Sequence, residues 1–590
     1  MKKSTVLLVG ALVLVLVAAN LVGLAQTEED LEIVSEDELF DYLQRTTDES
    51  ENSSYEEETI VYGLGLNDRV DRLYEDEDFD VSGTSDADIV ELEWDEGDVY
   101  ARTFAYGIAM ESSDENVLRR IEIDEVEAVA LAKTPDGTAD ALAESVGVFL
   151  ENSDENTFEH VRVDEVSGLA EATVDEEGSG EATSEALSAG VYLKGSKDNR
   201  FKYLDLGEIS VEAEASSPEE ETATEERFGV FVDENSSGNE FLNSSVFGFR
   251  NEAEGTVLRF SEVREDRGYG VRNLSSDVTD LALNWWGSED GPDYDGDDDG
   301  EVDYSGGGSK IRGPASFSPW LKTDPDADDD EAGVQLVSPL PILVSHVGPV
   351  PSTDTGNEGY LNKAIWGSNL VDVRGKVVVE HGTYSLEEEI TDGLILISEC
   401  GSSCKTIVDN GESSDKESNQ IVIDSDEVEI GDREGYSSRG FTFKEDLEVT
   451  NRVDASTVSI NWNNLEGEVH NLGTGSLDAR YNWWGDLDPS DDVEGEVDYR
   501  PFLPVEVCSF VEYMEKHELE DPKTAAAAKS LEDAGGKKKL TSQLIAHFNV
   551  KPREADELFD EFGYGKVKRA FESSGKTYDR FLDNLGVSSI

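Results

Sequence analysis

The chain has 590 residues, with 47 Lys and Arg against 134 Asp and Glu, and a formal net charge of −87. Disorder could explain such charge, but 37% of the residues are hydrophobic and they are placed periodically, which excludes it for most of the chain. The charge instead indicates a halophilic protein, because the Debye length falls to about 3 Å in 1 M salt and self-repulsion is screened. We therefore expect folding to depend on high ionic strength, and we expect no nucleic acid as a partner.

The first 25 residues have the composition of an export signal. Lys2 and Lys3 precede an apolar run from Val6 to Leu24, and Ala25 is small enough to mark a cleavage site. The run is also long enough to remain as a membrane anchor, so a cleaved signal peptide and an anchor both stay open. In either case we expect the rest of the chain to be extracellular or at the cell surface.

A cap segment is expected between residues 26 and 58. Ser35 and Glu38 form a capping box, which predicts an amphipathic helix over 35–45. A stack of strands needs its open end covered, because an exposed strand edge promotes aggregation. We assign that role to this helix and expect strands to begin near Thr59.

Four similar segments begin at Tyr106, Val146, Ala189 and Phe228, at intervals of about 40 residues. Each has a glycine, then an asparagine, then a bulky apolar residue followed by alternating apolar positions, as in strands with one buried face. The asparagines are Asn116, Asn156, Asn199 and Asn239, and the bulky apolar residues are Leu118, Phe158, Phe201 and Phe241. The pattern predicts stacked strands, with the asparagines as a ladder in the turns and the apolar residues as one buried column.

The length of one turn is inferred from residues 229–284, where similar segments follow one another at about 20 residues. A 40-residue period then equals two turns, so neighbours in each column should lie about 10 Å apart. The remaining stretches, at 133–144, 174–188 and 212–226, are rich in Ala, Glu, Ser and Thr. We expect them to leave one edge of the stack as loops, which either are solvated or form a binding face.

Two copies of a tryptophan-rich motif end the strand-rich parts of the sequence. The first runs from LALNWWGSEDGP to SPWL at 281–321, and the second is ARYNWWGDLDPSDDVEGEVDYRPFLP at 479–504. The motif resembles the closing turn of right-handed parallel β-helix repeats in the pectate-lyase-like superfamily, and the segments from Tyr106 are similar to its periplasmic copper-binding-type repeats. The resemblance implies a mainly β fold with two right-handed parallel β-helix solenoids in tandem.

The tryptophans of the two motifs are interpreted as end caps, because large apolar side chains can cover the end of a stack. A platform for stacking carbohydrate is the alternative. The residues are Trp285, Trp286, Trp483 and Trp484.

Composition divides the rest of the chain. An acidic and then Pro- and Gly-rich stretch predicts a linker, and the end of the chain alternates Pro and Gly with amphipathic segments, which predicts a small domain of short helices. The expected domains are 1–25 signal peptide or anchor, 26–58 cap, 59–321 first β-helix, 322–350 linker, 351–505 second short β-helix and 506–590 helical domain.

One segment resembles a calcium-binding loop. Asp295, Asp297, Asp299 and Asp303 have the spacing of its first ligands, but Gly306 stands where such a loop has glutamate. A chain this acidic also matches the pattern by chance, so calcium and a chance match both stay open.

Two kinds of covalent modification are expected outside the cell. Cys400 and Cys404 bracket a short turn, and they either form a disulfide or remain free thiols. Four asparagines begin N-x-S glycosylation sequons. They are Asn52, Asn235, Asn243 and Asn273.

The leading functional hypothesis is adhesion or binding by a cell-surface or secreted protein, with a carbohydrate or a component of the cell envelope as the partner. A polysaccharide lyase or glycoside hydrolase on the same scaffold is the first alternative, and a structural envelope protein is the second. No catalytic residue is assigned, because carboxylate pairs carry little information in this chain and the fold alone grants no activity. Residues 506–590 are nearly neutral, which indicates either a docking surface for a protein partner or only the needs of helix stability.

Overall fold

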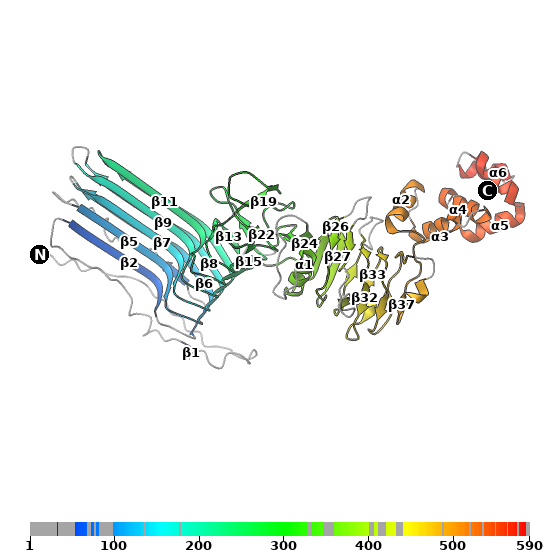
Figure 1. Cartoon of the computed structure of the whole chain (residues 1–590), viewed down its shortest axis with the longest axis horizontal. Coiled ribbons are helices and arrows are strands. Elements are labelled where there is room, and N and C mark those ends of the chain that lie inside the picture. The colour runs from blue at the N-terminus through cyan, green and yellow to red at the C-terminus, as the bar shows by residue number, and fades with distance from the viewer. Residues whose placement is uncertain are drawn as a thin grey trace.

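The computed structural model describes residues 32–33, 54–67, 72–75, 78–81 and 98–585, the last range with gaps at 135–136, 176–178, 327–331, 346–358, 400–405, 411–419, 432–439, 486–488, 518–520, 534–535, 549, 563 and 575–576. The chain is mainly β, with parallel sheets followed by helices. Figure 1 shows an elongated molecule with long strands at one end and the helices at the other. The expected export signal and the helix at 35–45 lie outside the described residues.

Two large sheets form the first β part. One has the order β1(Glu32–Ile33), β3(Arg72–Glu75), β6(Val117–Thr134), β8(Thr157–Val174), β10(Arg200–Ser216), β12(Glu240–Leu242), β15(Val257–Arg259), β18(Thr279–Asp280) and β22(Ala315–Ser316), with β4(Asp78–Val81), β13(Ser245–Phe247) and β16(Glu262–Arg264) beside it. The other, called the outer sheet below, has the order β2(Ser54–Asn67), β5(Asp98–Glu111), β7(Ala139–Glu151), β9(Glu181–Lys194), β11(Glu220–Val232), β14(Phe249–Asn251), β17(Val271–Asn273), β21(Gly308–Arg312), β19(Pro292–Asp295) and β20(Tyr304–Ser305). Side chains from both sheets fill one shared core.

Each 40-residue repeat contributes one strand to each sheet, so the expectation of two turns per repeat is wrong. Phe158, Phe201 and Phe241 pair in register on neighbouring strands, and their rings stack with centroids 4.5 and 4.9 Å apart instead of about 10 Å. A 20-residue turn occurs only from about Glu240 onward. There the strands of these two sheets have two to five residues, whereas the earlier strands have up to 18.

The Ala-rich stretches expected as loops are mostly the far halves of the long strands. Residues 133–144, 174–188 and 212–226 fall largely within β6 to β11. Ala139, Ala141 and Ala143 are fully buried while the residues between them are partly exposed, which is the two-residue period of a strand. Alanine and glutamate are depleted in strands generally, so composition and periodicity disagreed here, and periodicity was the better guide.

The repeated glycines allow neighbouring strands of the outer sheet to approach closely. A Cβ on Gly147 would lie 2.7 Å from the carbonyl oxygen of Gly190 and 2.7 Å from a methyl group of Val163. On either side of this glycine, Val148 enters the shared core and Val146 enters a second apolar cluster on the opposite face of the sheet. Glycine therefore lets the strand bury side chains on both faces at this point.

Three further sheets form the second β part. The largest has the order β23(Trp320–Leu321), β24(Leu340–Val344), β25(Gly375–Val379), β27(Leu394–Ser398), β30(Glu429–Ile430), β33(Ser459–Ile460), β36(Leu477–Asp478) and β38(Val497–Asp498). The second sheet has the order β26(Gly382–Tyr384), β28(Thr406–Val408), β31(Thr442–Phe443) and β34(Asn464–Leu465). The third has the order β29(Gln420–Ile423), β32(Asp446–Val449), β35(Val469–Asn471) and β37(Val493–Glu494). Strand β24 comes from the expected linker, so the boundary expected at 351 is wrong and residues 340–344 belong to this sheet.

A buried charge cluster joins the two β parts. Helix α1(Tyr360–Asn369) buries Lys363 completely. Its ammonium lies 2.7 Å from Asp280, and Arg259 reaches the same carboxylate oxygen at 2.8 Å. Both cations lie over the ring of Trp366, at 4.1 and 4.5 Å from its centroid. Burial raises the pKa of Asp280, but Lys363 and Arg259 outweigh that effect and hold the pKa below its usual range.

The helical region follows the second β part. It contains α2(Val507–His517), α3(Pro522–Asp533), α4(Gly536–Phe548), α5(Pro552–Phe562), α6(Tyr564–Ser573) and α7(Tyr578–Leu585). Helices α2 and α3 share an apolar cluster with Trp462 and Leu503, whereas α4 to α7 have a core of their own. The bundle of short helices expected from Pro, Gly and amphipathic segments is confirmed, but its first two helices belong with the end of the second β part.

Candidate binding site

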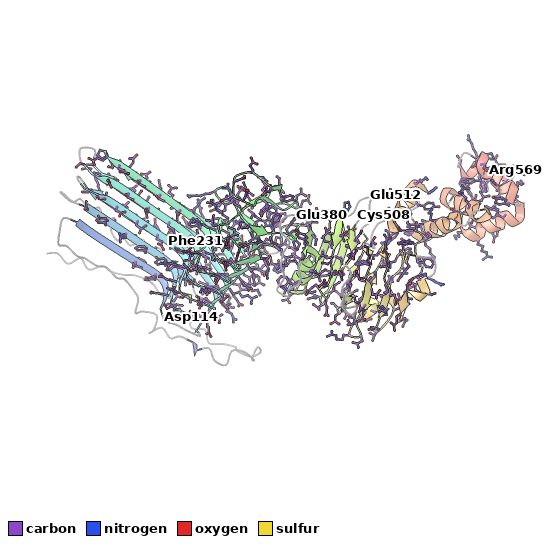
Figure 2. All side chains as sticks on the ribbon, in the orientation of Figure 1. Asp114, Phe231, Glu380, Cys508, Glu512 and Arg569 are labelled. Atoms are coloured by element: carbon purple, nitrogen blue, oxygen red, sulfur yellow. The ribbon has the colours of Figure 1, made fainter. Side chains whose placement is uncertain are left out.

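A row of aromatic side chains crosses the face of the outer sheet that points away from the shared core. Successive rings have centroids 5.6, 4.9, 5.4 and 4.8 Å apart. The row consists of Tyr62 on β2, Tyr106 on β5, Phe149 on β7, Tyr192 on β9 and Phe231 on β11, the last of which is labelled in Figure 2. Tyr62 pairs in register with Tyr106, and Phe149, Tyr192 and Phe231 pair in register with one another. Between Tyr106 and Phe149 the row shifts by three residues, because Tyr106 pairs with Val146. Neighbouring strands about 4.8 Å apart bring the rings of both groups into one row.

The aromatic row was missed in the sequence, although a signal for it is present. Phe149, Tyr192 and Phe231 each stand two residues after the repeated glycine. They pair in register and form an apolar cluster separate from the shared core, and all three are partly exposed. An aromatic residue at the same outward position of successive repeats predicts such a face.

The row, except for Phe231, lines a pocket of about 300 Å³ whose polar groups are mainly carboxyls. Glu111, Glu144 and Glu151 reach it, together with one cation, Lys194. The Lys194 ammonium lies 2.8 Å from Glu151, and the hydroxyl of Tyr106 donates a hydrogen bond to Glu144 at 3.0 Å. The pocket therefore combines aromatic faces with a surplus of negative charge.

Burial controls the protonation of these groups. It raises the pKa of Glu144, and the hydrogen bond from Tyr106 and the charge of Lys194 offset only part of the rise. Burial and the neighbouring Glu144 raise the pKa of Tyr106 above its usual range, and burial with nearby carboxylates raises the pKa of Tyr192 to about 12. Both tyrosines therefore keep their hydroxyl protons at neutral pH. The site offers their hydroxyl groups, the aromatic rings and the carboxyl group of Glu144, which holds its proton to a higher pH than an ordinary glutamate does.

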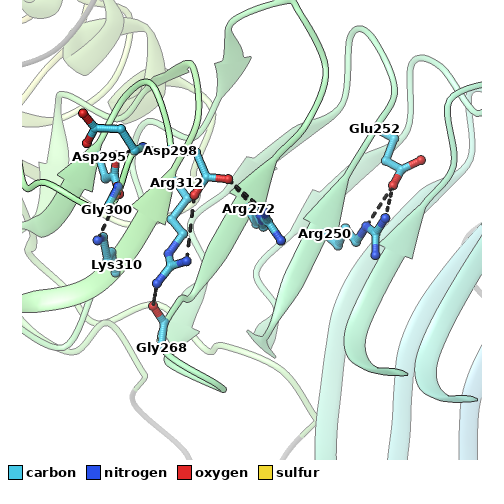
Figure 3. Close-up of polar contacts among 10 residues, drawn as sticks. Arg250, Glu252, Gly268, Arg272, Asp295, Asp298, Gly300, Lys310 and Arg312 are labelled. Atoms are coloured by element: carbon cyan, nitrogen blue, oxygen red, sulfur yellow. Dashed lines mark hydrogen bonds and ion pairs between the residues drawn. The ribbon is translucent and has the colours of Figure 1, made fainter. Parts of the chain in front are cut away.

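An arginine column continues the register of the aromatic row. Arg250 pairs with Phe231, and its guanidinium lies 5.0 Å from the ring centroid. Arg272 and Arg312 follow on the next strands, and both are ion-paired to Asp298 (Figure 3). Three guanidinium groups on neighbouring strands would repel one another. Glu252, which is paired with Arg250, and Asp298 reduce that repulsion. The column is thus a neutralised rim of the aromatic site.

The expected calcium loop is only partly assembled. Carboxylate oxygens of Asp295, Asp297 and Asp299 lie within 4.8 Å of one another. Asp303 instead accepts a hydrogen bond from a backbone N–H at 2.8 Å, so the fourth expected ligand is used elsewhere. Asp295 is fully buried and lies 3.1 Å from the Lys310 ammonium, as Figure 3 shows. Because Lys310 supplies the positive charge at this carboxylate, the donor set fits Ca²⁺ poorly.

The repeated asparagines form a continuous ladder. Each side-chain amide donates to the oxygen of the next, at 3.0 Å from Asn116 to Asn156 and 3.1 Å for each of the two following steps. A second ladder runs beside it and was missed in the sequence: the backbone N–H groups of Ser113, Ser153 and Ser196 each donate to the hydroxyl of the next serine, at 2.9 to 3.0 Å. A serine three residues before each asparagine was the available signal. Both ladders are buried, so they hold the turns together and take no part in the pocket.

The two tryptophan pairs divide between neighbouring cores. Trp286 is fully buried in the core of the first β part, while Trp285 packs against the core of the second. Trp484 is buried in the second core, and Trp483 packs against the cluster that contains α2 and α3. Trp285 and Trp483 each form an isolated parallel β-bridge, and adjacent residues of an extended segment point to opposite sides, which explains the division. None of the four lines the aromatic pocket.

The one described cysteine lies outside the expected pair. Cys508 on α2, labelled in Figure 2, is disulfide-bonded. Cys400 and Cys404 lie outside the described residues. The chain has three cysteines, so a bond between Cys400 and Cys404 would leave Cys508 without a partner in the chain. The expected pairing is therefore incompatible with the bond of Cys508.

Two of the expected glycosylation sites are internal. Asn243 is 8% exposed and Asn273 2% exposed, and both side-chain amides donate hydrogen bonds to backbone carbonyls, which leaves no room for a glycan. Asn235 is exposed and fits the expectation. Asn52 lies outside the described residues.

Comparison with protein-family models, with curated proteins and with solved structures finds no match to this chain. Among the described residues, no helix is both long and apolar enough to cross a membrane. Among the described residues, the aromatic pocket of the outer sheet is the best candidate for a functional site.

Proposed function

We propose that this chain is an exported, halophile-adapted protein that binds an uncharged glycan chain on the aromatic row of its outer sheet. The row itself is the observation that carries the proposal. Four of the five rings are partly exposed, and because most of them stack on one another, the row offers a continuous apolar surface of ring edges to the apolar faces of successive sugar rings, while tyrosine hydroxyls offer hydrogen bonds.

The charge of the pocket supports an uncharged ligand. Glu111, Glu144 and Glu151 face one cation, Lys194, whose charge is already balanced by Glu151. A uronate or sulfate group would enter next to surplus carboxyls, and such like-charge contact costs several kcal/mol when it is desolvated. A neutral sugar avoids this cost and can still accept a hydrogen bond from Glu144 while that acid is protonated.

The same proposal includes the scaffold. Parallel sheets with a shared core, in-register asparagine and serine ladders and one strand of each sheet per repeat support a right-handed parallel β-helix of the pectate-lyase-like type, followed by a second, shorter one. In such a scaffold, equivalent outward-facing side chains recur at regular intervals along the axis. This regular spacing suits the binding of a polymer with repeating units. A location outside the cell follows from the signal-like first 25 residues.

Calorimetric titration with neutral hexasaccharides tests this proposal. Cellohexaose, laminarihexaose and maltohexaose would be titrated into the full-length protein and into Phe149→Ala and Tyr192→Ala. Each lost ring should weaken binding about tenfold, equivalent to about 1.4 kcal/mol. Tyr578→Ala, which removes a partly exposed ring from α7, is the matched control and should bind as the wild type does. Failure of all three sugars to bind would reject the proposal.

A glycoside hydrolase is the second candidate, because of Glu144. A buried acid with a raised pKa beside an ion-paired carboxylate is the arrangement in which one group donates a proton and the other stays charged. Incubation with the same hexasaccharides and measurement of reducing ends separates the two functions. Cleavage that disappears in Glu144→Gln would make the protein an enzyme, whereas binding without cleavage supports the adhesive function.

A further inference from the structure

A second groove, of about 480 Å³, lies where the first β part meets α1. One wall is formed by β10, β12 and β15, and the other by the residues that follow α1. Pockets of this size are large enough for a small organic molecule, and they occur preferentially between packed structural units.

The groove reverses the charge balance of the chain. Arg200, Lys202 and Arg259 line it, against Glu240 and Asp372. In the whole chain, basic residues number 47 against 134 acidic ones, so the groove is more basic than the chain as a whole. At contact distance these cations favour an anionic ligand.

Lys202 is the cation best placed to receive an anion. Arg200 is 3.6 Å from Glu240, and Arg259 is held by Asp280 at 2.8 Å. Lys202 is partly buried, and within the described part of the chain it makes no ion pair; its ammonium lies over the ring of Tyr203, 4.9 Å from the centroid. A partly desolvated ammonium gains more from a carboxylate than a fully exposed one does.

The remaining wall is apolar. Phe260, Leu336, Leu370 and Val371 line it together with the ring of Trp366. Leu370 is 55% exposed, an unusual exposure for a leucine in a chain whose other leucines are mostly buried. A ligand that reaches Lys202 would cover this surface with its body.

We propose that the junction groove binds a small amphipathic carboxylate, with its head group on Lys202 and its hydrocarbon body against Leu370, Val371 and Trp366. An inorganic anion would leave most of the groove volume and its apolar wall unused. A neutral glycan would leave Lys202 without a counter-charge. The groove is separate from the aromatic pocket, so this binding is independent of the glycan.

Octanoate is the probe, and 1-octanol is its neutral counterpart of equal chain length. Calorimetry on the full-length protein at constant ionic strength should show one octanoate per chain and at least about tenfold weaker binding of 1-octanol. Lys202→Met should weaken octanoate at least about tenfold and leave octanol unchanged, while Lys202→Arg should retain octanoate. Lys197→Met removes an equal charge from an exposed position in the turn before β10 and should bind as the wild type does.

Leu370→Glu provides a second and independent variant. It changes an exposed side chain, so the fold should persist, and its carboxylate should repel the probe from the apolar wall. Equal affinity for octanoate and octanol, or unchanged octanoate affinity in Lys202→Met, would overturn the carboxylate site. Absence of any octanoate binding to the wild-type protein would overturn it as well.

Discussion

At the scale of single residues, the aromatic site depends on how burial changes the chemistry of Glu144. Burial favours the neutral form of this acid, and the hydrogen bond that it accepts from Tyr106 offsets only part of that effect. Nothing in its own sequence context distinguishes Glu144 from the many other glutamates of the chain. Its role follows from the neighbours that β5 and β9 place beside it, so it could not be predicted from the sequence.

The raised pKa of Glu144 gives stability a specific pH dependence. The folded chain binds this proton more tightly than the unfolded chain does, so the contribution of Glu144 to the free energy of unfolding falls as pH rises from the ordinary carboxyl value of about 4.3 through the raised value. Glu144→Gln stays neutral and should lose less stability over that window. Denaturant titrations across pH, with Glu111→Gln as a control that removes a charge from the edge of the pocket, measure the difference. Identical slopes for wild type and Glu144→Gln would contradict this account.

At the scale of elements, the repeats were the most predictable part of the molecule. The positions of the asparagines and phenylalanines in one column each follow from the sequence period, because in-register parallel strands must stack equivalent residues. The number of turns in each 40-residue repeat could not be predicted from the sequence period. Strand length sets how many residues one turn consumes, and the alanine-rich halves of β6 to β11 look like loops by composition.

Removal of one asparagine should weaken the whole stack. Asn156 donates to Ser113 and Asn199 and accepts from Asn116, all within the buried turn. Asn156→Ala leaves these groups without partners and should lower the free energy of unfolding by at least about 2 kcal/mol. Denaturant unfolding measures this change, with exposed Asn235→Ala as the matched control. A loss as small as that of the control would show that the ladder contributes little to stability.

At the scale of the whole molecule, the parts are more tightly joined than the sequence suggests. The expected linker supplies β24, and Lys363, Asp280 and Arg259 connect the two β parts through buried charges. Helix α2 packs on Trp462, and the side-chain oxygen of Asn464 accepts a hydrogen bond from the backbone N–H of Val507 at 2.9 Å. These connections between the parts depend on contacts between residues far apart in sequence. No local sequence pattern predicts such contacts.

Two truncations distinguish the helices that belong to the β part from those that do not. Deletion of 536–590 removes α4 to α7, which have their own core, and should leave the thermal unfolding of the β parts unchanged. Deletion of 506–590 also removes α2 and α3, exposes Trp462 and Trp483 and eliminates the disulfide of Cys508, so it should lower the melting temperature. Equal melting temperatures for the two truncations would show that α2 and α3 do not support the second β part.

Saturation-transfer difference NMR tests glycan binding on the aromatic row most directly. Saturation of aromatic protons should pass to the C–H protons on one face of the sugar rings of a neutral hexasaccharide that binds, because only that face lies on the row. The signal should be lost in the double variant Phe149→Ala/Tyr192→Ala, while Tyr578→Ala retains it. Undiminished transfer in the double variant would place the glycan elsewhere on the molecule and contradict the account.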